Sequence, residues 1–176
     1  MKRLLTFTLV LLALAARADQ GATEPPLSAK AQAQAIQTLN EALADKTISK
    51  QQFDEALSWV RSTPCAGVDR SLTGPRKLEL GRAIAKQEKR KRVDVYQSFS
   101  DAGWSIIYLG TRISDNGYFF YSGDPLAAAR AVTVWSGAAP VFEASEIAQW
   151  VLKNVPGIPP RLAKCFAWHV TLNRDL

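Results

Sequence analysis

The sequence is poor in the residues that most often build metal and catalytic centres. Its 176 residues include one histidine, His169, and two cysteines, Cys65 and Cys165. Because zinc sites use three or four such ligands, this supply predicts no metal site. The phosphate-binding patterns G-x-x-x-x-G-K-S/T and G-x-G-x-x-G are also absent, which argues against nucleotide chemistry. We therefore expect no cofactor.

No apolar run is long enough for a membrane-spanning helix, which needs about 20 residues. The longest, over 4–16, follows Lys2 and Arg3 and precedes the small-residue triplet 16–18. This three-part order is typical of a secretory signal peptide over 1–18, cleaved after Ala18. We expect an exported protein without an anchor, periplasmic or secreted. An uncleaved N-terminal anchor helix is the alternative.

Positive charge is concentrated in one segment of the mature chain. Removing Lys2, Arg3 and Arg17 lowers the formal net charge from +6 to +3. Residues 76–92 alone carry eight basic and two acidic side chains, so the rest of the mature chain is mildly acidic. The densest run predicts an anionic-surface site, and its residues are Lys89, Arg90, Lys91 and Arg92. Export argues against nucleic acid as the partner, and a solvated helix face without specific function is the alternative.

The two cysteines suggest a disulfide, because an exported chain reaches an oxidising compartment. Closing a loop of 100 residues between Cys65 and Cys165 would stabilise the fold by about 4 to 5 kcal/mol in the chain-entropy model. The alternative is a hydrolase in which Cys165 or Ser136 is the nucleophile and His169 the base. The segment 165–172 resembles a strand, in which side chains four residues apart lie too far from each other to form such a pair. This argues against the hydrolase.

Capping and periodicity patterns predict an α+β domain: N-terminal helices packed on an antiparallel β-meander, with one helix inserted before the last strand. After the signal peptide and a flexible leader over 19–27, residues 28–176 form this single domain. It divides into a helical hairpin over 28–62, a basic helix over 74–91, and a sheet with an inserted helix over 92–176. The inserted helix is expected over 143–154 and the last strand over 165–172.

Asn116-Gly117 lies between two β-rich runs and predicts a two-residue type I′ hairpin turn. This turn would place four side chains of interface-prone type together on one face, namely Tyr108, Arg112, Phe119 and Tyr121. That face is a candidate protein-binding site. The alternative is that a helix covers it and makes it part of the core.

These observations favour a binding protein over an enzyme. The leading hypothesis is a periplasmic inhibitor or immunity-type protein that neutralises a toxin or hydrolase acting on the cell envelope. One alternative is an envelope-binding or assembly factor that places its basic helix on anionic lipid or cell-wall polymer. The other is the small secreted hydrolase that uses His169.

Overall fold

A computed structural model describes residues 27–113 and 115–173, and it confirms the α+β class. The predicted signal peptide and residues 19–26 of the predicted leader lie outside the described residues, whereas Leu27 is buried in the core. The elements in chain order are α1 (Ala29–Ala44), α2 (Lys50–Arg61), α3 (Gly74–Gln87), β1 (Asp94–Asp101), β2 (Trp104–Gly110), β3 (Gly117–Ser122), β4 (Thr133–Ser136), a 3₁₀ turn (Val141–Glu143), α4 (Ala144–Asn154), α5 (Pro160–Trp168) and a π-helical turn (His169–Asn173).

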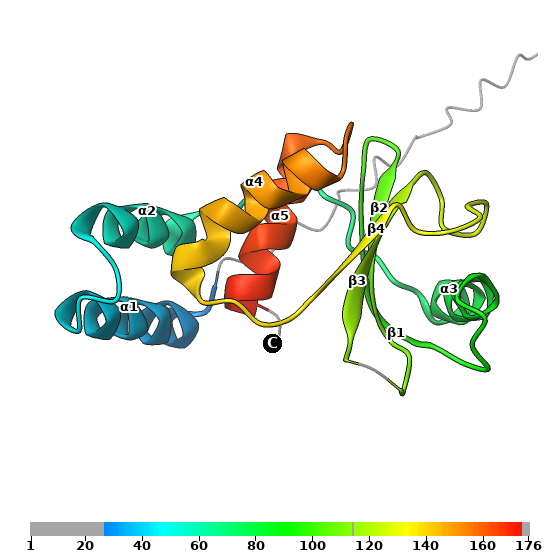
Figure 1. The fold of residues 1–176 in the computed structure, drawn as a ribbon, viewed down its shortest axis with the longest axis horizontal. Coiled ribbons are helices and arrows are strands. Elements are labelled where there is room, and N and C mark those ends of the chain that lie inside the picture. The colour runs from blue at the N-terminus through cyan, green and yellow to red at the C-terminus, as the bar shows by residue number, and fades with distance from the viewer. Residues whose placement is uncertain (1–26, 114, 174–176) are drawn as a thin grey trace, which may run out of the picture.

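The first two helices begin at caps that the sequence predicts. The Ser28 side chain accepts a hydrogen bond from the Ala31 backbone at the start of α1. Ser49 and Gln52 exchange hydrogen bonds at the start of α2 and form a capping box. Such caps satisfy backbone N–H groups that have no partner within the helix. The predicted helical hairpin is therefore confirmed, and Figure 1 shows it at the end of the molecule farthest from α3.

The four strands form an antiparallel meander in the order β1-β2-β3-β4. The sheet lies between two helical layers, with α3 on one face and α4 and α5 on the other (Figure 1). The face under α3 carries Ile107, Leu109, Phe119 and Tyr121, and the opposite face carries Ile106, Tyr118 and Phe120. Because helices cover both faces, the central strands β2 and β3 are apolar on both sides.

The predicted register of the β2–β3 hairpin is wrong. Leu109 pairs with Gly117 and Tyr108 with Tyr118, so β2 ends at Gly110 and Gly117 already belongs to β3. The predicted turn would instead have paired Arg112 with Tyr121. The two registers differ by an odd number of residues, and such a shift moves a strand's side chains to opposite faces. Phe119 and Tyr121 therefore do not share a face with Tyr108.

The expected strand over 165–172 is helical instead, as α5 and the π-helical turn that follows it. Nearly every side chain from Leu162 to Val170 is buried. Residues 165–170 are buried one after another, so this stretch lacks the alternation of apolar and polar residues by which a surface helix is recognised. The aromatic and β-branched residues of this segment then favour the prediction of a strand.

The basic helix is also shorter than predicted, since α3 ends at Gln87 rather than near Lys91. Lys89 adopts a left-handed φ of 52°, and the Arg90 backbone N–H donates to Ala85 O at 2.8 Å. These features close the helix, so residues 89–92 form the connection to β1. Among the described residues, no helix combines the length and apolar character needed to cross a bilayer.

Candidate functional site

A groove of about 650 Å³ runs between α3 and the start of β1. It is lined by α3 from Gly74 to Ala85 and by residues 91–95, and we call it the α3–β1 groove. Its floor is apolar, because Ala85, Val93 and Val95 are buried there. The groove therefore lies over the edge of the buried cluster beneath α3, to which these three residues belong.

Two features of α3 leave the groove open. Leu80 and Ile84 point into the core beneath the helix, whereas Leu78 on the groove side is 62% exposed. Gly81 has no side chain, and a Cβ there would lie 3.5 Å from the Val93 carbonyl oxygen. The helix can therefore approach residue 93 without filling the groove. An exposed leucine in a concave apolar surface is a feature typical of binding sites.

Two leucines of α3 lie close together in the sequence, and only Leu80 packs in the core. Residues 78 and 80 lie two positions apart, so they cannot point in the same direction from a helix. The sequence pattern allowed either leucine to pack with Ile84, and the fold selects Leu80. Leu78 is the functional candidate that sequence reasoning missed. The only sign of it in the sequence is that either Leu78 or Leu80 could have been the buried leucine of this helix.

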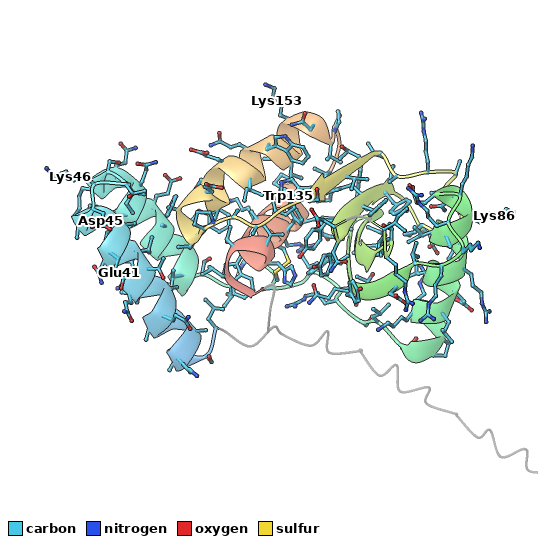
Figure 2. All side chains as sticks on the ribbon, turned by 60° about the horizontal axis from the view of Figure 1, so that its bottom comes forward. Glu41, Asp45, Lys46, Lys86, Trp135 and Lys153 are labelled. Atoms are coloured by element: carbon cyan, nitrogen blue, oxygen red, sulfur yellow. A yellow bond between two sulfur atoms is a disulfide. The ribbon has the colours of Figure 1, made fainter. Side chains whose placement is uncertain are left out.

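Basic side chains form the rim of the groove, with Lys77 and Arg82 on α3 and Lys91 and Arg92 on the connection to β1. Across residues 27–113 and 115–173, no acidic side chain forms an ion pair with Lys77, Arg82 or Lys91. Figure 2 shows Lys86 of α3 at one end of the molecule and Glu41 and Asp45 at the other. Lys86 of α3 is thus far from these acids.

Asp94 is the acidic residue of the groove, and two arginines neutralise it. Arg112 Nε donates to its Oδ2 at 2.5 Å, and Arg92 Nη2 lies 2.9 Å from its Oδ1. The hydrogen bond from Arg112, supported by Arg92, lowers the pKa of Asp94, and Asp94 in turn raises the pKa of Arg112. The carboxylate stays ionised and paired, so the remaining rim charge of the groove is positive.

Of the predicted anionic-surface residues, Lys91 and Arg92 line the groove. Lys89 and Arg90 are exposed in the turn before it. The structure therefore brings half of this set to the candidate site. All four side chains lie on a connection rather than on a helix face.

The predicted protein-binding set is not brought together. Phe119 and Tyr121 are buried under α3, where burial raises the pKa of Tyr121 and its hydroxyl donates to Gln87 Oε1 at 3.1 Å. Tyr108 is half-buried on the opposite face and stacks on Tyr118 with ring centroids 4.3 Å apart. Arg112 alone is exposed and connected to the groove, through Asp94.

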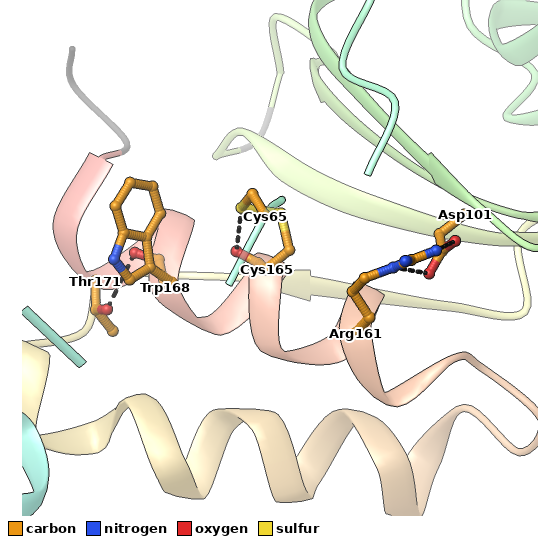
Figure 3. Close-up of a disulfide and its surroundings, with 6 residues drawn as sticks. All are labelled: Cys65, Asp101, Arg161, Cys165, Trp168 and Thr171. Atoms are coloured by element: carbon orange, nitrogen blue, oxygen red, sulfur yellow. Dashed lines mark hydrogen bonds and ion pairs between the residues drawn. A yellow bond between two sulfur atoms is a disulfide. The ribbon is translucent and has the colours of Figure 1, made fainter. Parts of the chain in front are cut away.

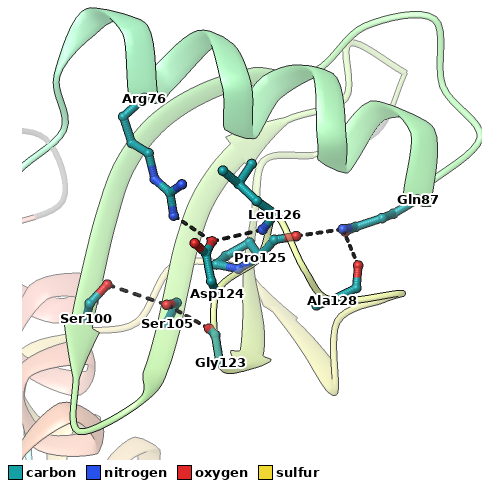
Figure 4. Close-up of polar contacts among 9 residues, drawn as sticks. All are labelled: Arg76, Gln87, Ser100, Ser105, Gly123, Asp124, Pro125, Leu126 and Ala128. Atoms are coloured by element: carbon teal, nitrogen blue, oxygen red, sulfur yellow. Dashed lines mark hydrogen bonds and ion pairs between the residues drawn. The ribbon is translucent and has the colours of Figure 1, made fainter.

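Polar contacts at both ends of α3 hold it over the sheet (Figure 4). Arg76 Nη2 donates to Asp124 Oδ1 at 2.6 Å near the start of the helix. Near its end, Gln87 Nε2 donates to the carbonyl oxygens of Pro125 and Ala128, both at 2.8 Å. These contacts fix the helix, and with it one wall of the groove, to the loop after β3.

Cys65 and Cys165 form a disulfide with a sulfur–sulfur distance of 2.07 Å, as the sequence predicts. It joins the loop after α2 to α5, and Figure 3 shows it beneath the sheet. In the same view, Arg161 at the start of α5 binds the buried carboxylate of Asp101 at the end of β1, with Nε 3.0 Å from Oδ2. These links fasten α5 to both the helical hairpin and the sheet.

The residues considered for hydrolysis lie in unsuitable places for it. The Cys165 sulfur belongs to the disulfide, and His169 is fully buried with its ring 4.8 Å from that of Phe99. Ser136 is exposed at the end of β4, where it pairs with Gly117. In the part of the chain that the structure describes, no three His, Cys, Asp or Glu side chains gather to hold a metal ion.

Comparison with protein-family models, with curated proteins and with solved structures found no significant match to this chain. The principal features of the candidate site are the apolar floor, the exposed Leu78, and Lys77, Arg82 and Lys91 of the rim, which have no acidic partner in the part of the chain that the structure describes.

Proposed function

We propose that this chain is an exported binding protein that attaches to another protein and neutralises it, in the manner of an inhibitor or an immunity protein. The observation that carries the proposal is the α3–β1 groove, in which the exposed Leu78 and an apolar floor adjoin Lys77, Arg82 and Lys91, three cations that form no ion pair among the described residues. Apolar contacts supply affinity in protein interfaces, and surrounding charges guide association and select the partner.

The chemistry of the other candidate residues supports binding over catalysis. The one pair of cysteines is used for a disulfide, which suits an oxidising compartment outside the cytoplasm. The single histidine is buried in the core between aromatic rings. A rigid, cross-linked scaffold with a preformed groove loses little conformational entropy when it binds a partner.

Attachment to anionic lipid or cell-wall polymer is the second candidate function, because residues 76–92 carry a net charge of +6. Its contacts would be electrostatic, so salt would weaken them strongly. Protein binding through the groove would also need Leu78, whose side chain contributes no charge. The two functions therefore predict different responses to salt and to substitution at this residue.

The test is affinity capture of the exported chain from its native envelope fraction, at low and at moderate salt. We expect one stoichiometric protein that is retained at moderate salt and lost with Leu78→Asp. Leu152→Asp is the matched control, because Leu152 is also an exposed leucine but lies on α4. Recovery of only salt-labile lipid or polymer, or of nothing, would overturn the proposed function.

A further inference from the structure

We propose that the α3–β1 groove receives an acidic segment of the partner protein, whose apolar side chains contact the floor while its carboxylates meet the rim. This inference rests on the proposed function and specifies the chemistry of the partner.

The shape favours a protruding segment over a flat surface. The floor at Ala85, Val93 and Val95 lies between the helix and the strand, and the whole groove has a volume of about 650 Å³. A planar bilayer contacts convex surfaces and would meet the rim without reaching this floor. Several side chains of a partner segment can enter the groove and cover the exposed Leu78.

The charges specify the sign of the segment. Lys77, Arg82 and Lys91 lack acidic partners among the described residues. Asp94, which would otherwise repel a carboxylate, is neutralised by Arg92 and Arg112. A carboxylate beside an apolar contact gains a charge-assisted hydrogen bond in a partly desolvated setting. A basic segment would meet uncompensated like charges instead.

The edge of the sheet argues against a partner strand added to β1. Asp69 already pairs with Ser100 on the outer edge of this strand, through backbone hydrogen bonds of 2.8 and 2.9 Å. Closer to the groove, the register between β1 and β2 shifts between Val95 and Gln97, and this shift marks a bulge in β1. Bulges interrupt the regular row of backbone groups that an added strand requires. Side chains of the segment therefore provide the contact.

The experiment is photo-crosslinking of the full chain in the cells that produce it. The photoreactive residue p-benzoyl-phenylalanine replaces Leu78 in one variant and Leu152 in the control. Mass spectrometry then identifies the attached segment. We expect a crosslink from position 78 to a protein segment rich in Asp and Glu with interspersed apolar residues, and none to that segment from position 152.

Charge reversal on the rim is the second arm. Arg82→Glu in the position-78 variant should lower the crosslink yield about tenfold or more, equivalent to about 1.4 kcal/mol of binding free energy. Lys153→Glu, an exposed lysine on α4, should leave the yield unchanged. Circular dichroism of the purified variants checks that each is folded.

Each other result overturns the inference in a distinguishable way. A crosslink to lipid, to a basic segment or to no molecule at position 78 would refute it. Affinity capture can still recover a stoichiometric protein whose retention is not weakened by Arg82→Glu. In that case the proposed function stands, but the groove is not the surface that binds the partner. If neither method recovers a protein, both proposals fail.

Discussion

Asp94 connects the candidate site to the stability of the fold. Its carboxylate binds Arg112 from the β2–β3 connection and Arg92 from the segment before β1. The pair of arginines lowers its pKa below the ordinary value of about 3.9 for an aspartate. Between the two pKa values, the unfolded chain therefore binds more protons than the folded one.

This difference predicts a pH dependence with a definite sign. The stabilisation from Asp94 is present above the unfolded pKa and is lost as pH falls through the lower folded pKa. Asp94→Asn should be less stable than wild type at pH 7 and should lose less stability between pH 7 and 3. Urea unfolding at a series of pH values measures both. Parallel pH profiles for the two proteins would contradict the prediction.

At the scale of elements, the β1–β2 hairpin contains a two-residue turn of the kind that the sequence predicts at Asn116-Gly117. Asp101 pairs with Trp104 across the turn, and both central residues are left-handed, with φ of 44° at Ala102 and 80° at Gly103. Type I′ turns require this conformation and favour Asn-Gly. Alanine is strained there, because its Cβ approaches the following carbonyl oxygen.

Ala102→Asn should therefore stabilise the protein by about 0.5 to 1 kcal/mol. The substitution gives the turn the residue that adopts positive φ more readily, and Ala102 is exposed, so no core contact changes. Urea unfolding of wild type, Ala102→Asn and the exposed control Ala129→Asn measures the effect. A midpoint equal to or below that of wild type, or an equal rise in the control, would contradict it.

For the whole molecule, the disulfide joins the loop after the helical hairpin to the buried helix α5 across 100 residues. The double variant Cys65→Ala/Cys165→Ala should lose about 4 kcal/mol of stability, because its unfolded chain regains the entropy of an open loop. The wild-type protein should lose a similar amount in a reducing agent, whereas the double variant should not respond to it. Unfolding curves with and without dithiothreitol test this prediction. If dithiothreitol also lowered the stability of the double variant, its effect on the wild-type protein could not be assigned to the disulfide.

The sequence by itself determined the caps of α1 and α2, the α+β class and the pairing of the cysteines. These features follow from neighbours within a few residues, or from the presence of only two cysteines. Patterns of capping and alternation therefore suffice to predict them. The net charge of the segment that borders the groove was also visible in the sequence.

Only the tertiary structure decided the β2–β3 register, the helical state of α5 and the orientation of α3. Each depends on which surfaces pack together: both sheet faces are covered, residues 165–170 are buried one after another, and Leu80 rather than Leu78 enters the core. Packing of this kind involves residues far apart in the chain, so local periodicity does not determine it. The candidate site therefore became visible only when α3 had a fixed position over β1.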